Sequence, residues 1–267
     1  MPSLSVAVVA LNEEERLRPC LESVSWADEV VVVDAGSSDK TVAIAREFTD
    51  RVLFRAWTGY GPQKNFALGQ CTGDWILSLD ADERVPEPLR DEVRAAARRG
   101  PSEAGFAIAR QNVFMGRWIR HGGLYPDYQL RLFRRDRARF SERAVHESAS
   151  VEGPTGRFRT PLVHESYRSV ADFLQRANRY SDLAAAELVT AGRGGSLGDL
   201  TLRPLGRFLG MYVVRAGFLD GWRGLVLAAL YAHYVFVREV KARELRAGRT
   251  GQRSAAETPA GGAGAPD

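Results

Sequence analysis

The sequence predicts an α/β fold: a mostly parallel sheet with helices on both faces, followed by C-terminal amphipathic helices. Over the first half of the chain, apolar runs of strand length alternate with helix-like segments. Beyond about residue 168, helical periodicity replaces this alternation. We therefore expect an α/β domain over residues 1–168, a helical region over 169–250 and a disordered tail over 251–267, where Ala, Gly and Pro dominate.

The elements of the first region follow one another in a β-α-β-α-β-α-β order. Such an order favours a parallel sheet that is buried on both faces. In open sheets of this kind, ligands bind beyond the carboxyl ends of the strands. In chain order, the predicted elements are a strand at 5–11, a helix at 17–24, a strand at 29–34, a helix at 39–48, a strand at 51–54, a helix at 63–68 and a strand at 74–79.

Two of these strands end in carboxylates. Asp34 closes the second apolar run, and Asp80 and Asp82 follow the last one with a single residue between them. Carboxylates spaced in this way offer hard oxygen ligands to Mg²⁺ or Mn²⁺, which complete their coordination with water and substrate phosphates. A solvated acidic turn is the alternative interpretation. Because both acidic ends fall on one edge of a parallel sheet, we favour a ligand site.

Composition adds few constraints. The chain has 267 residues, a formal net charge of +4 and two cysteines, Cys20 and Cys71, which we interpret as ordinary buried thiols. The first predicted strand begins almost at once, so we expect no secretory leader and a cytoplasmic location. Basic residues gather over 238–253 near the C-terminus.

Several sequence blocks resemble inverting family 2 glycosyltransferases, whose Rossmann-like fold is called GT-A. The blocks that carry this resemblance, in the order and spacing of the family, are Val8–Glu14, Val33–Thr41, Gln63–Asn65 and Asp80–Asp82. Residues 122–134 and 142–147 also resemble a narrower branch, the bacterial glucosyltransferases of lipopolysaccharide and lipooligosaccharide core assembly. The resemblance implies transfer of a hexose, first of all glucose, from a nucleoside-diphosphate sugar such as a UDP-sugar to an envelope glycan or glycolipid. A polyprenyl-phosphate acceptor and a non-catalytic sugar-nucleotide binder are the alternatives.

The resemblance also implies roles for the motif residues. Asp82 would bind Mg²⁺ or Mn²⁺ directly, and Asp80 would contact the ribose or reach the metal through water. Asp34 would accept hydrogen bonds from the uracil or ribose, although helix capping is an alternative for Asp34 and for Asp39. The remaining residues implied for the nucleotide site are Asp39, Gln63, Lys64 and Asn65.

An inverting displacement needs a general base near the acceptor hydroxyl. Glu142 is the first candidate, with Glu147 next and Asp127 as a further alternative. We expect His146 to contact the metal or the pyrophosphate, or else to serve as a structural histidine. The pair His164-Glu165 also stands out, because the chain has four histidines in all.

Arg131 and Arg134 belong to a predicted strand in which basic and apolar residues alternate. We expect both guanidinium groups on one face of that strand, where they could bind diphosphate oxygens. A solvated basic strand face is the alternative.

The helical region has three predicted segments, at 169–192, from Pro204 onward and at 222–237. The uncharged run at 224–237 is shorter than the ~20 residues that a spanning helix needs. Its aromatic residues and the neighbouring arginines favour an interfacial helix on an anionic membrane surface. We therefore expect a protein peripheral on the cytoplasmic face of the inner membrane. A helical hairpin that packs on the first domain or in a dimer is the alternative.

Two other classes of protein fit less well. A nicotinamide-dependent dehydrogenase would carry a Gly-x-Gly-x-x-Gly turn after the first strand, where this chain has Asn12-Glu13-Glu14. A nucleic-acid-binding module could use the basic tail, but that tail lacks interleaved aromatic residues.

Overall fold

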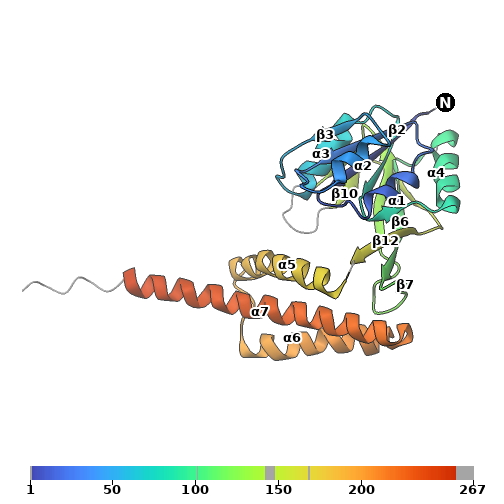
Figure 1. Ribbon diagram of the computed structural model, residues 1–267. Coiled ribbons are helices and arrows are strands. Elements are labelled where there is room, and N and C mark those ends of the chain that lie inside the picture. The colour runs from blue at the N-terminus through green and yellow to red at the C-terminus, as the bar shows by residue number, and fades with distance from the viewer. Residues whose placement is uncertain (1, 101, 142–147, 168, 257–267) are drawn as a thin grey trace, which may run out of the picture. The chain divides into compact units, whose positions relative to one another are not determined.

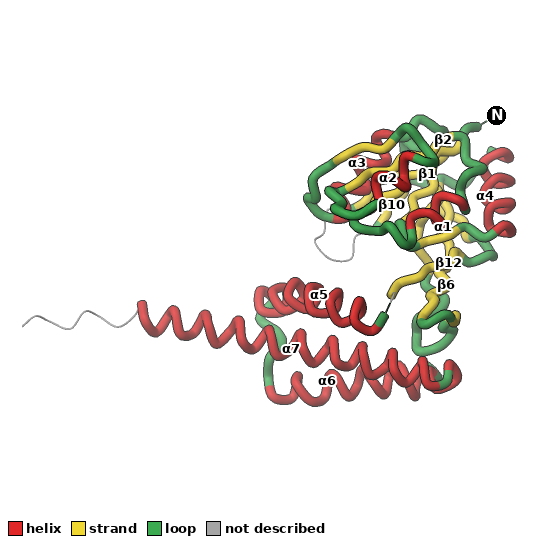
Figure 2. The backbone as a smooth tube through the Cα atoms, in the orientation of Figure 1, coloured by secondary structure: helices red, strands yellow, loops and turns green. Residues whose placement is uncertain are grey.

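The computed structural model describes residues 2–100, 102–141, 148–167 and 169–256, and the chain divides into two compact units, 1–168 and 169–267. All of the described strands belong to the first unit, whereas the described part of the second unit is helical (Figures 1 and 2). The fold class predicted from the sequence is confirmed.

The first unit is built on one large mixed sheet. Its main strand order is β3-β2-β1-β4-β8-β6-β12-β5, in which β1 to β4 are parallel to one another and β8 is antiparallel to both of its neighbours. The carboxyl ends of β1 to β4 therefore share one edge. The elements of this unit are β1 (Leu4–Ala10), α1 (Leu17–Glu22), β2 (Glu29–Asp34), α2 (Thr41–Arg46), β3 (Val52–Phe54), α3 (Tyr60–Gln70), β4 (Trp75–Asp80), β5 (Glu83–Arg84), α4 (Glu87–Arg99), β6 (Gly105–Phe114), β7 (Arg117–Trp118), β8 (Tyr128–Arg134), β9 (Ala138–Phe140), β10 (Ala149–Val151), β11 (Thr155–Arg157) and β12 (Leu162–Tyr167).

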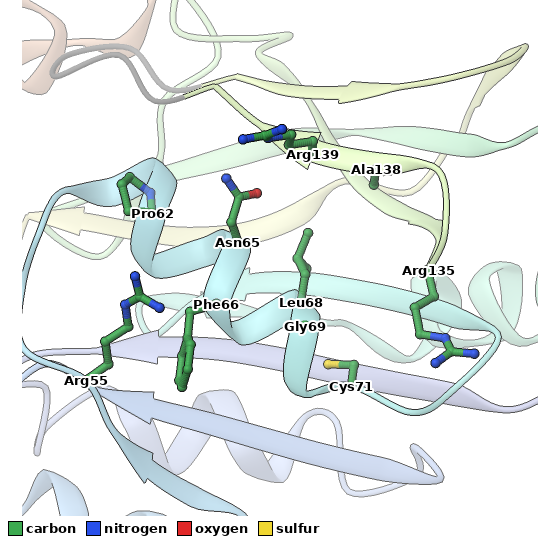
Figure 3. A pocket seen from close by; sticks show the side chains of 10 residues that line it. All are labelled: Arg55, Pro62, Asn65, Phe66, Leu68, Gly69, Cys71, Arg135, Ala138 and Arg139. Atoms are coloured by element: carbon green, nitrogen blue, oxygen red, sulfur yellow. The ribbon is translucent and has the colours of Figure 1, made fainter.

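A groove of about 630 Å³ follows α3 on the outside of this unit (Figure 3). Arg55 lies beside Phe66 at one end, with its guanidinium carbon 4.6 Å from the ring centroid, and Arg135 lies near Cys71 at the other. Neither Asp80 nor Asp82 lines it. This groove is therefore separate from the acidic strand ends.

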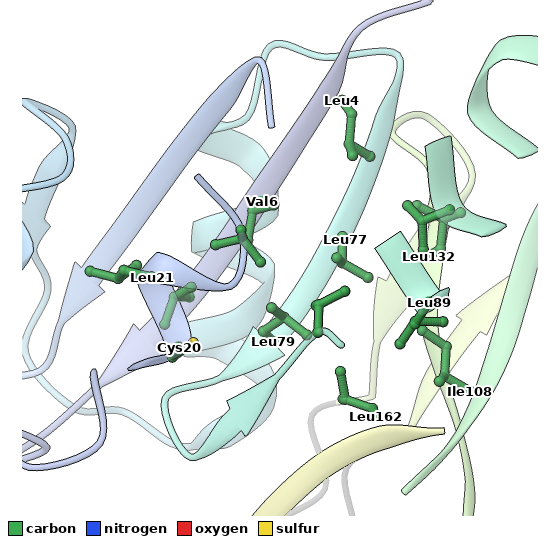
Figure 4. Close-up of a cluster of buried hydrophobic side chains, with 14 of the residues drawn as sticks. Leu4, Val6, Cys20, Leu21, Leu77, Leu79, Leu89, Ile108, Leu132 and Leu162 are labelled. Carbon is green, nitrogen blue, oxygen red and sulfur yellow. The ribbon is translucent and has the colours of Figure 1, made fainter. Parts of the chain in front are cut away.

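The core of the first unit has two layers, one on each face of the sheet. Val6 and Val8 of β1 pack in one layer with leucines from β4, α1 and α4 (Figure 4). Ala7, between them in the sequence, packs in the other layer with residues of β2 and α3. Successive side chains of a strand point to opposite faces, so a strand with helices on both sides must be apolar throughout. This explains the unbroken apolar runs in the sequence.

The second unit consists of helices, with α7 lying between α5 and α6 (Figure 1). Among its contacts is an edge-on packing of Phe173 against Tyr231, at 5.5 Å between ring centroids. Among the described residues, no helix has a stretch that is both long and apolar enough to span a bilayer. Its elements are α5 (Val170–Thr190), α6 (Leu197–Leu209), the π-helix η1 (Gly210–Val214), the 3₁₀-helix η2 (Gly217–Asp220) and α7 (Trp222–Ala256).

The helices of this unit begin and end differently from the sequence prediction. α6 begins at Leu197 rather than Pro204, because Ser196 and Asp199 form a capping box that satisfies its first N–H groups. Within the run 224–237, Leu227 and Val235 are buried. α7 continues to Ala256, into the segment expected to be disordered, and residues 257–267 lie outside the described part of the chain.

Candidate active site

Asp80, the last residue of β4, lies between two cationic side chains. Its Oδ1 is 2.8 Å from Lys64 Nζ, and its Oδ2 accepts a hydrogen bond of 2.6 Å from Arg131 Nη2. Burial raises the pKa of Asp80, but Arg131 and Lys64 outweigh burial and hold that pKa well below its usual range. Asp80 is therefore a charged carboxylate whose orientation is fixed from two sides.

Arg131 also binds Glu83, which is fully buried. Burial raises the pKa of Glu83, although the nearby Arg131 opposes this shift. Glu83 Oε2 in turn accepts the backbone N–H of Asp80 at 3.0 Å. Arg131 therefore serves protein carboxylates in this structure, and we infer that it positions Asp80 rather than contacting a diphosphate.

Asp82 faces His164 of β12. His164 Nε2 is 3.6 Å from Asp82 Oδ1, and His164 Nδ1 is 2.7 Å from Asn112 Oδ1. Asn112 Nδ2 donates to the Leu124 carbonyl at 2.8 Å, which identifies Oδ1 as the atom facing the imidazole. Asn112 Oδ1 and the Ser166 hydroxyl oxygen, 3.0 Å from Nδ1, both face that nitrogen, so the ring is held with Nε2 directed at Asp82.

Arg16 connects the first sequence block to this pair. Its Nη1 lies 3.5 Å from Asp82 Oδ2 and donates to the Glu165 carbonyl at 3.0 Å. Glu13 fixes the other side of the guanidinium with two hydrogen bonds of 2.7 Å. Burial raises the pKa of Asp82, whereas His164 and Arg16 lower it, and the balance lies below the usual value.

Asp82 and His164 are candidate ligands for a divalent cation. Mg²⁺ binds its ligands at about 2.1 Å in octahedral geometry, so adjacent ligands lie about 3 Å apart, and these two atoms, 3.6 Å apart, would move slightly closer to share the ion. Asn112 supplies the outer hydrogen bond that typically orients a ligating histidine. No group of three or more such ligands occurs within the described ranges. Such an ion would supply Lewis-acid stabilisation of a departing diphosphate.

Asp34 and Asp39 both organise the turn that follows β2. Asp34 is buried and accepts the backbone N–H groups of Gly36 and Ser37 at 2.9 and 3.0 Å. Asp39 accepts the N–H and the hydroxyl of Thr41 at 2.9 and 2.5 Å, at the start of α2. Burial raises the pKa of Asp39, but these hydrogen bonds lower it by more, so the pKa lies below its usual value. Asp39 therefore fixes the turn just before α2, whose N-cap residue is Lys40, and Asp34 shapes a loop at the carboxyl edge of the sheet.

Gln63 and Asn65 flank Lys64 but do not contact Asp80. Gln63 is buried, and its Nε2 donates to the Arg55 carbonyl at 2.9 Å. Asn65 binds the backbone of Phe140 through both atoms of its amide, at 2.9 and 2.8 Å. Of this block, Lys64 is the residue that contacts the acidic motif, within the part of the chain that the structure describes.

Arg134 lies away from the site. Its guanidinium carbon is 5.0 Å from the centroid of the Trp75 ring, at the amino end of β4. Five residues of strand, or about 17 Å, separate Trp75 from Asp80. The expectation that Arg131 and Arg134 share a face is wrong, because an odd separation in a strand reverses the side chain.

Of the three candidate bases, Glu142 and Glu147 lie outside the described residues, as does His146, the expected metal or pyrophosphate contact. Asp127 accepts hydrogen bonds of 2.8 Å from Arg110 Nε and Gln129 Nε2. Burial raises the pKa of Asp127, but Arg110 more than offsets it, so the carboxylate is a weak base in this arrangement.

Comparisons with known proteins identify the family of this chain. Residues 5–150 match the family described as Glycosyl transferase family 2. The lipopolysaccharide core biosynthesis glycosyltransferase LpsC of Rhizobium meliloti is 32% identical over 255 residues, which cover 90% of this chain and 94% of the relative. An uncharacterized glycosyltransferase of Rickettsia typhi is 30% identical, with 92% and 88% covered.

Solved structures show weaker likeness. Staphylococcus aureus TarS 1-349 is 18% identical, with 94% of this chain and 92% of that chain covered and a TM-score of 0.45. Glucosyl-3-phosphoglycerate synthase from Mycobacterium tuberculosis, in complex with Mg²⁺ and uridine-diphosphate, is 25% identical over 41% of this chain and 44% of that chain, with a TM-score of 0.37. From its family match and its relatives, the chain belongs to glycosyl transferase family 2, and it is a glycosyltransferase.

Proposed function

We propose that the protein is a metal-dependent inverting glycosyltransferase that moves a hexose, in the first instance glucose, from a UDP-sugar to an envelope glycan. The observation that carries this proposal is the convergence of Asp80, Asp82 and His164 at the carboxyl end of β4. The acceptor class, a lipopolysaccharide core or a similar glycolipid, is supported by the name of the Rhizobium relative.

Asp82 and His164 would hold Mg²⁺ or Mn²⁺, and each is fixed before a cation binds. Asn112 orients His164, and Arg16 lies beside the carboxylate of Asp82. The ion would supply charge stabilisation to the leaving diphosphate. Asp80, held by Lys64, would contact the ribose or reach the ion through a water molecule.

Asp34 and the turn after β2 would form the nucleoside end of the donor site. This turn and Asp80 lie at the carboxyl ends of β2 and β4, which are separated by β1. Ligands of open α/β sheets bind along this edge. Glu142 and, after it, Glu147 remain the proposed general bases, since Asp127 is already paired with Arg110.

We propose in addition that the second unit holds the enzyme on the cytoplasmic face of an anionic membrane. α6 supports this: Leu197, Leu202 and Leu205 are each more than half exposed. Exposed leucines on a helix are typical of segments that lie in a bilayer interface.

Asp82→Asn, in the full-length chain, tests the metal and donor assignments together. The variant keeps the size of the side chain but removes its charge, so we expect transfer and Mn²⁺-dependent UDP-glucose binding to fall at least about 100-fold. In the parent, UDP-glucose at ~100 times its dissociation constant should raise the stability by about 2.7 kcal/mol in a thermal-shift assay with Mn²⁺.

Asp50→Asn is the matched control, because Asp50 is exposed and lies outside the acidic motif. It should keep both donor binding and transfer. Transfer by the parent that persists in excess chelator would overturn the metal assignment. Binding of UDP-glucose without any acceptor-dependent turnover would instead indicate a sugar-nucleotide binder.

A further inference from the structure

α6 displays an apolar face that the second unit does not cover. Leu202, Leu205 and Leu209 follow one another at helical spacing, and none of the 13 residues of α6, all of them described, is buried. Leu202 is 69% exposed. The exposed apolar side chains continue beyond α6 through η1 and η2 to the start of α7, as Val213, Val214, Phe218, Leu219 and Trp222.

A groove of about 450 Å³ opens beside this face, between α6, η1 and α7. Four arginines line it: Arg203, Arg207, Arg215 and Arg238. Gly206 and Gly210 also line it, and a methyl group built on either glycine would meet nothing within 4 Å. The groove therefore combines open space with four guanidinium groups.

The positive charge of this groove is only partly balanced. Glu239 is fully buried and accepts hydrogen bonds from Arg203 at 3.0 Å and from Arg238 at 2.6 Å. Arg207 and Arg215 are exposed, and neither forms an ion pair with any residue that the structure describes. Arg238 Nε is in addition a buried donor without a hydrogen-bond partner in that part of the chain.

We propose that this groove binds the phosphate of an anionic phospholipid while the leucine face of α6 lies among the acyl chains. Guanidinium groups bind phosphate oxygens in pairs of parallel hydrogen bonds, and Arg207 and Arg215 are free to do so. A helix with one apolar face, flanking arginines and a nearby tryptophan is suited to the plane of a membrane interface. The groove would therefore bind one lipid headgroup specifically, in addition to the general attraction between the arginines and an anionic membrane surface.

A second copy of the chain is the competing occupant. A two-fold contact through this face would bring the unbalanced arginines of both copies to the same interface, where like charges repel. An anionic headgroup supplies the opposite charge, so the lipid fits better. The biological role of this site rests on the proposed function, in which the acceptor is a membrane glycolipid. Lipid binding itself requires no sugar transfer.

Vesicle flotation of the full-length protein tests the inference. We would compare phosphatidylcholine vesicles with vesicles of phosphatidylcholine and phosphatidylglycerol in equal parts, at low salt. Arg207→Gln/Arg215→Gln removes the two unpaired charges from exposed positions, so the fold should persist, as circular dichroism would verify. Arg94→Gln/Arg98→Gln, on the exposed side of α4, removes the same charge from the first unit and serves as the control.

The parent should float with the anionic vesicles and not with phosphatidylcholine alone. The groove variant should lose about 30-fold in apparent partition coefficient, about fivefold for each arginine, whereas the control should change less than about twofold. Inorganic phosphate at constant ionic strength should compete weakly, since it lacks acyl chains. Strong competition would identify a soluble phosphate ligand and overturn the lipid assignment.

Equal losses of partition coefficient in the groove and control variants would mean that net charge alone drives vesicle binding, and would overturn the headgroup site. A parent that stays at the bottom of the gradient and elutes as a dimer would overturn it in favour of the second copy. Turnover of UDP-glucose with a soluble acceptor, measured in parallel, should be the same for the parent and the groove variant. Its absence in the parent would count against the proposed function without affecting the flotation result.

Discussion

Replacing Arg131 by methionine tests whether one buried guanidinium holds the acidic motif in place. Arg131 is 3% exposed and hydrogen-bonds to Asp80 and to the fully buried Glu83. Methionine fills a similar volume but leaves Glu83 without its cation. Asp80 keeps Lys64, so the larger part of the cost falls on Glu83.

The expected loss is large for a single substitution. Removing one partner of a buried ion pair costs about 3–5 kcal/mol, because the remaining charge stays buried. With an m-value of about 2 kcal/mol/M in urea, this loss lowers the unfolding midpoint by about 2 M. The pKa of Glu83, already raised by burial, should rise further. A carboxyl group whose folded pKa lies above its unfolded pKa destabilises the fold as pH rises, so the loss should shrink as pH is lowered.

Urea unfolding followed by tryptophan fluorescence measures this effect. Four of the five tryptophans precede residue 168, so the signal reports mainly on the first unit. Adding Glu83→Gln to Arg131→Met should recover about half of the loss, since the buried charge disappears. Arg98→Met, on the exposed side of α4, is the control and should change the stability by less than about 0.5 kcal/mol.

Three outcomes would refute this reasoning. A midpoint shift below about 0.3 M for Arg131→Met would mean that the pair contributes little. A double variant less stable than Arg131→Met alone would mean that the charge of Glu83 is not the source of the cost. A loss that grows as pH is lowered would contradict the sign of the linkage.

Three further predictions concern other parts of the chain. Asn112→Ala should weaken Mn²⁺ binding in the presence of UDP by about 10–100-fold, measured by calorimetry, because the outer partner of the histidine ligand is lost. Ser5→Ala should cost about 1.5–3 kcal/mol near neutral pH, since Ser5 donates to the charged Glu29. Burial raises the pKa of Glu29, but bonds from Ser5 and Thr72 hold it below its usual value, so the stabilisation is present above about pH 4.5 and disappears as acid protonates the group in unfolding titrations. Gly224→Ala should lower the melting temperature of the second unit, because its methyl carbon would lie 1.9 Å from the Gly217 carbonyl oxygen.

Two control variants and one comparison of pH values test these three predictions. Gly206→Ala, where a methyl group meets nothing within 4 Å, should stabilise α6 by about 0.5–1 kcal/mol. Asn112→Asp keeps an oxygen acceptor for His164 and should retain more of the metal affinity than Asn112→Ala. If Ser5→Ala costs as much at pH 3 as at pH 7, the charge of Glu29 is not the source of the stabilisation.

The acidic end of β4 was accessible from sequence because the signal is local. An apolar strand that stops at Asp80 must place that carboxylate at the edge of the sheet, whatever the rest of the fold does. The Arg131–Glu83 pair gives no such signal, since its members are 48 residues apart and meet only because β8 pairs with β4. Sequence reasoning therefore found the motif but not the contacts of Arg131 with Asp80 and Glu83.

The contact between His164 and Asp82 shows the same limit. Of the two His-Glu pairs in the sequence, the first contains His146, the expected metal contact, which lies outside the described residues. His164 faces Asp82 because β12 pairs with both β6 and β5, a long-range arrangement that periodicity does not encode. For α6 a local signal was present but not used. The capping box formed by Ser196 and Asp199 marks the start of the helix, whereas the sequence analysis places that start at Pro204.

The pairing of Asp80 with Lys64 and Arg131 has a kinetic consequence. Since Asp80 is already neutralised, Asp82 and His164 are the groups in the described site that would attract a free cation. Two protein ligands hold Mg²⁺ weakly unless substrate oxygens complete its coordination. We therefore expect the cation and the nucleotide sugar to enter together, as a preformed complex. Initial rates should then follow the concentration of that complex, and an excess of metal-free nucleotide sugar should slow the enzyme by competing with it.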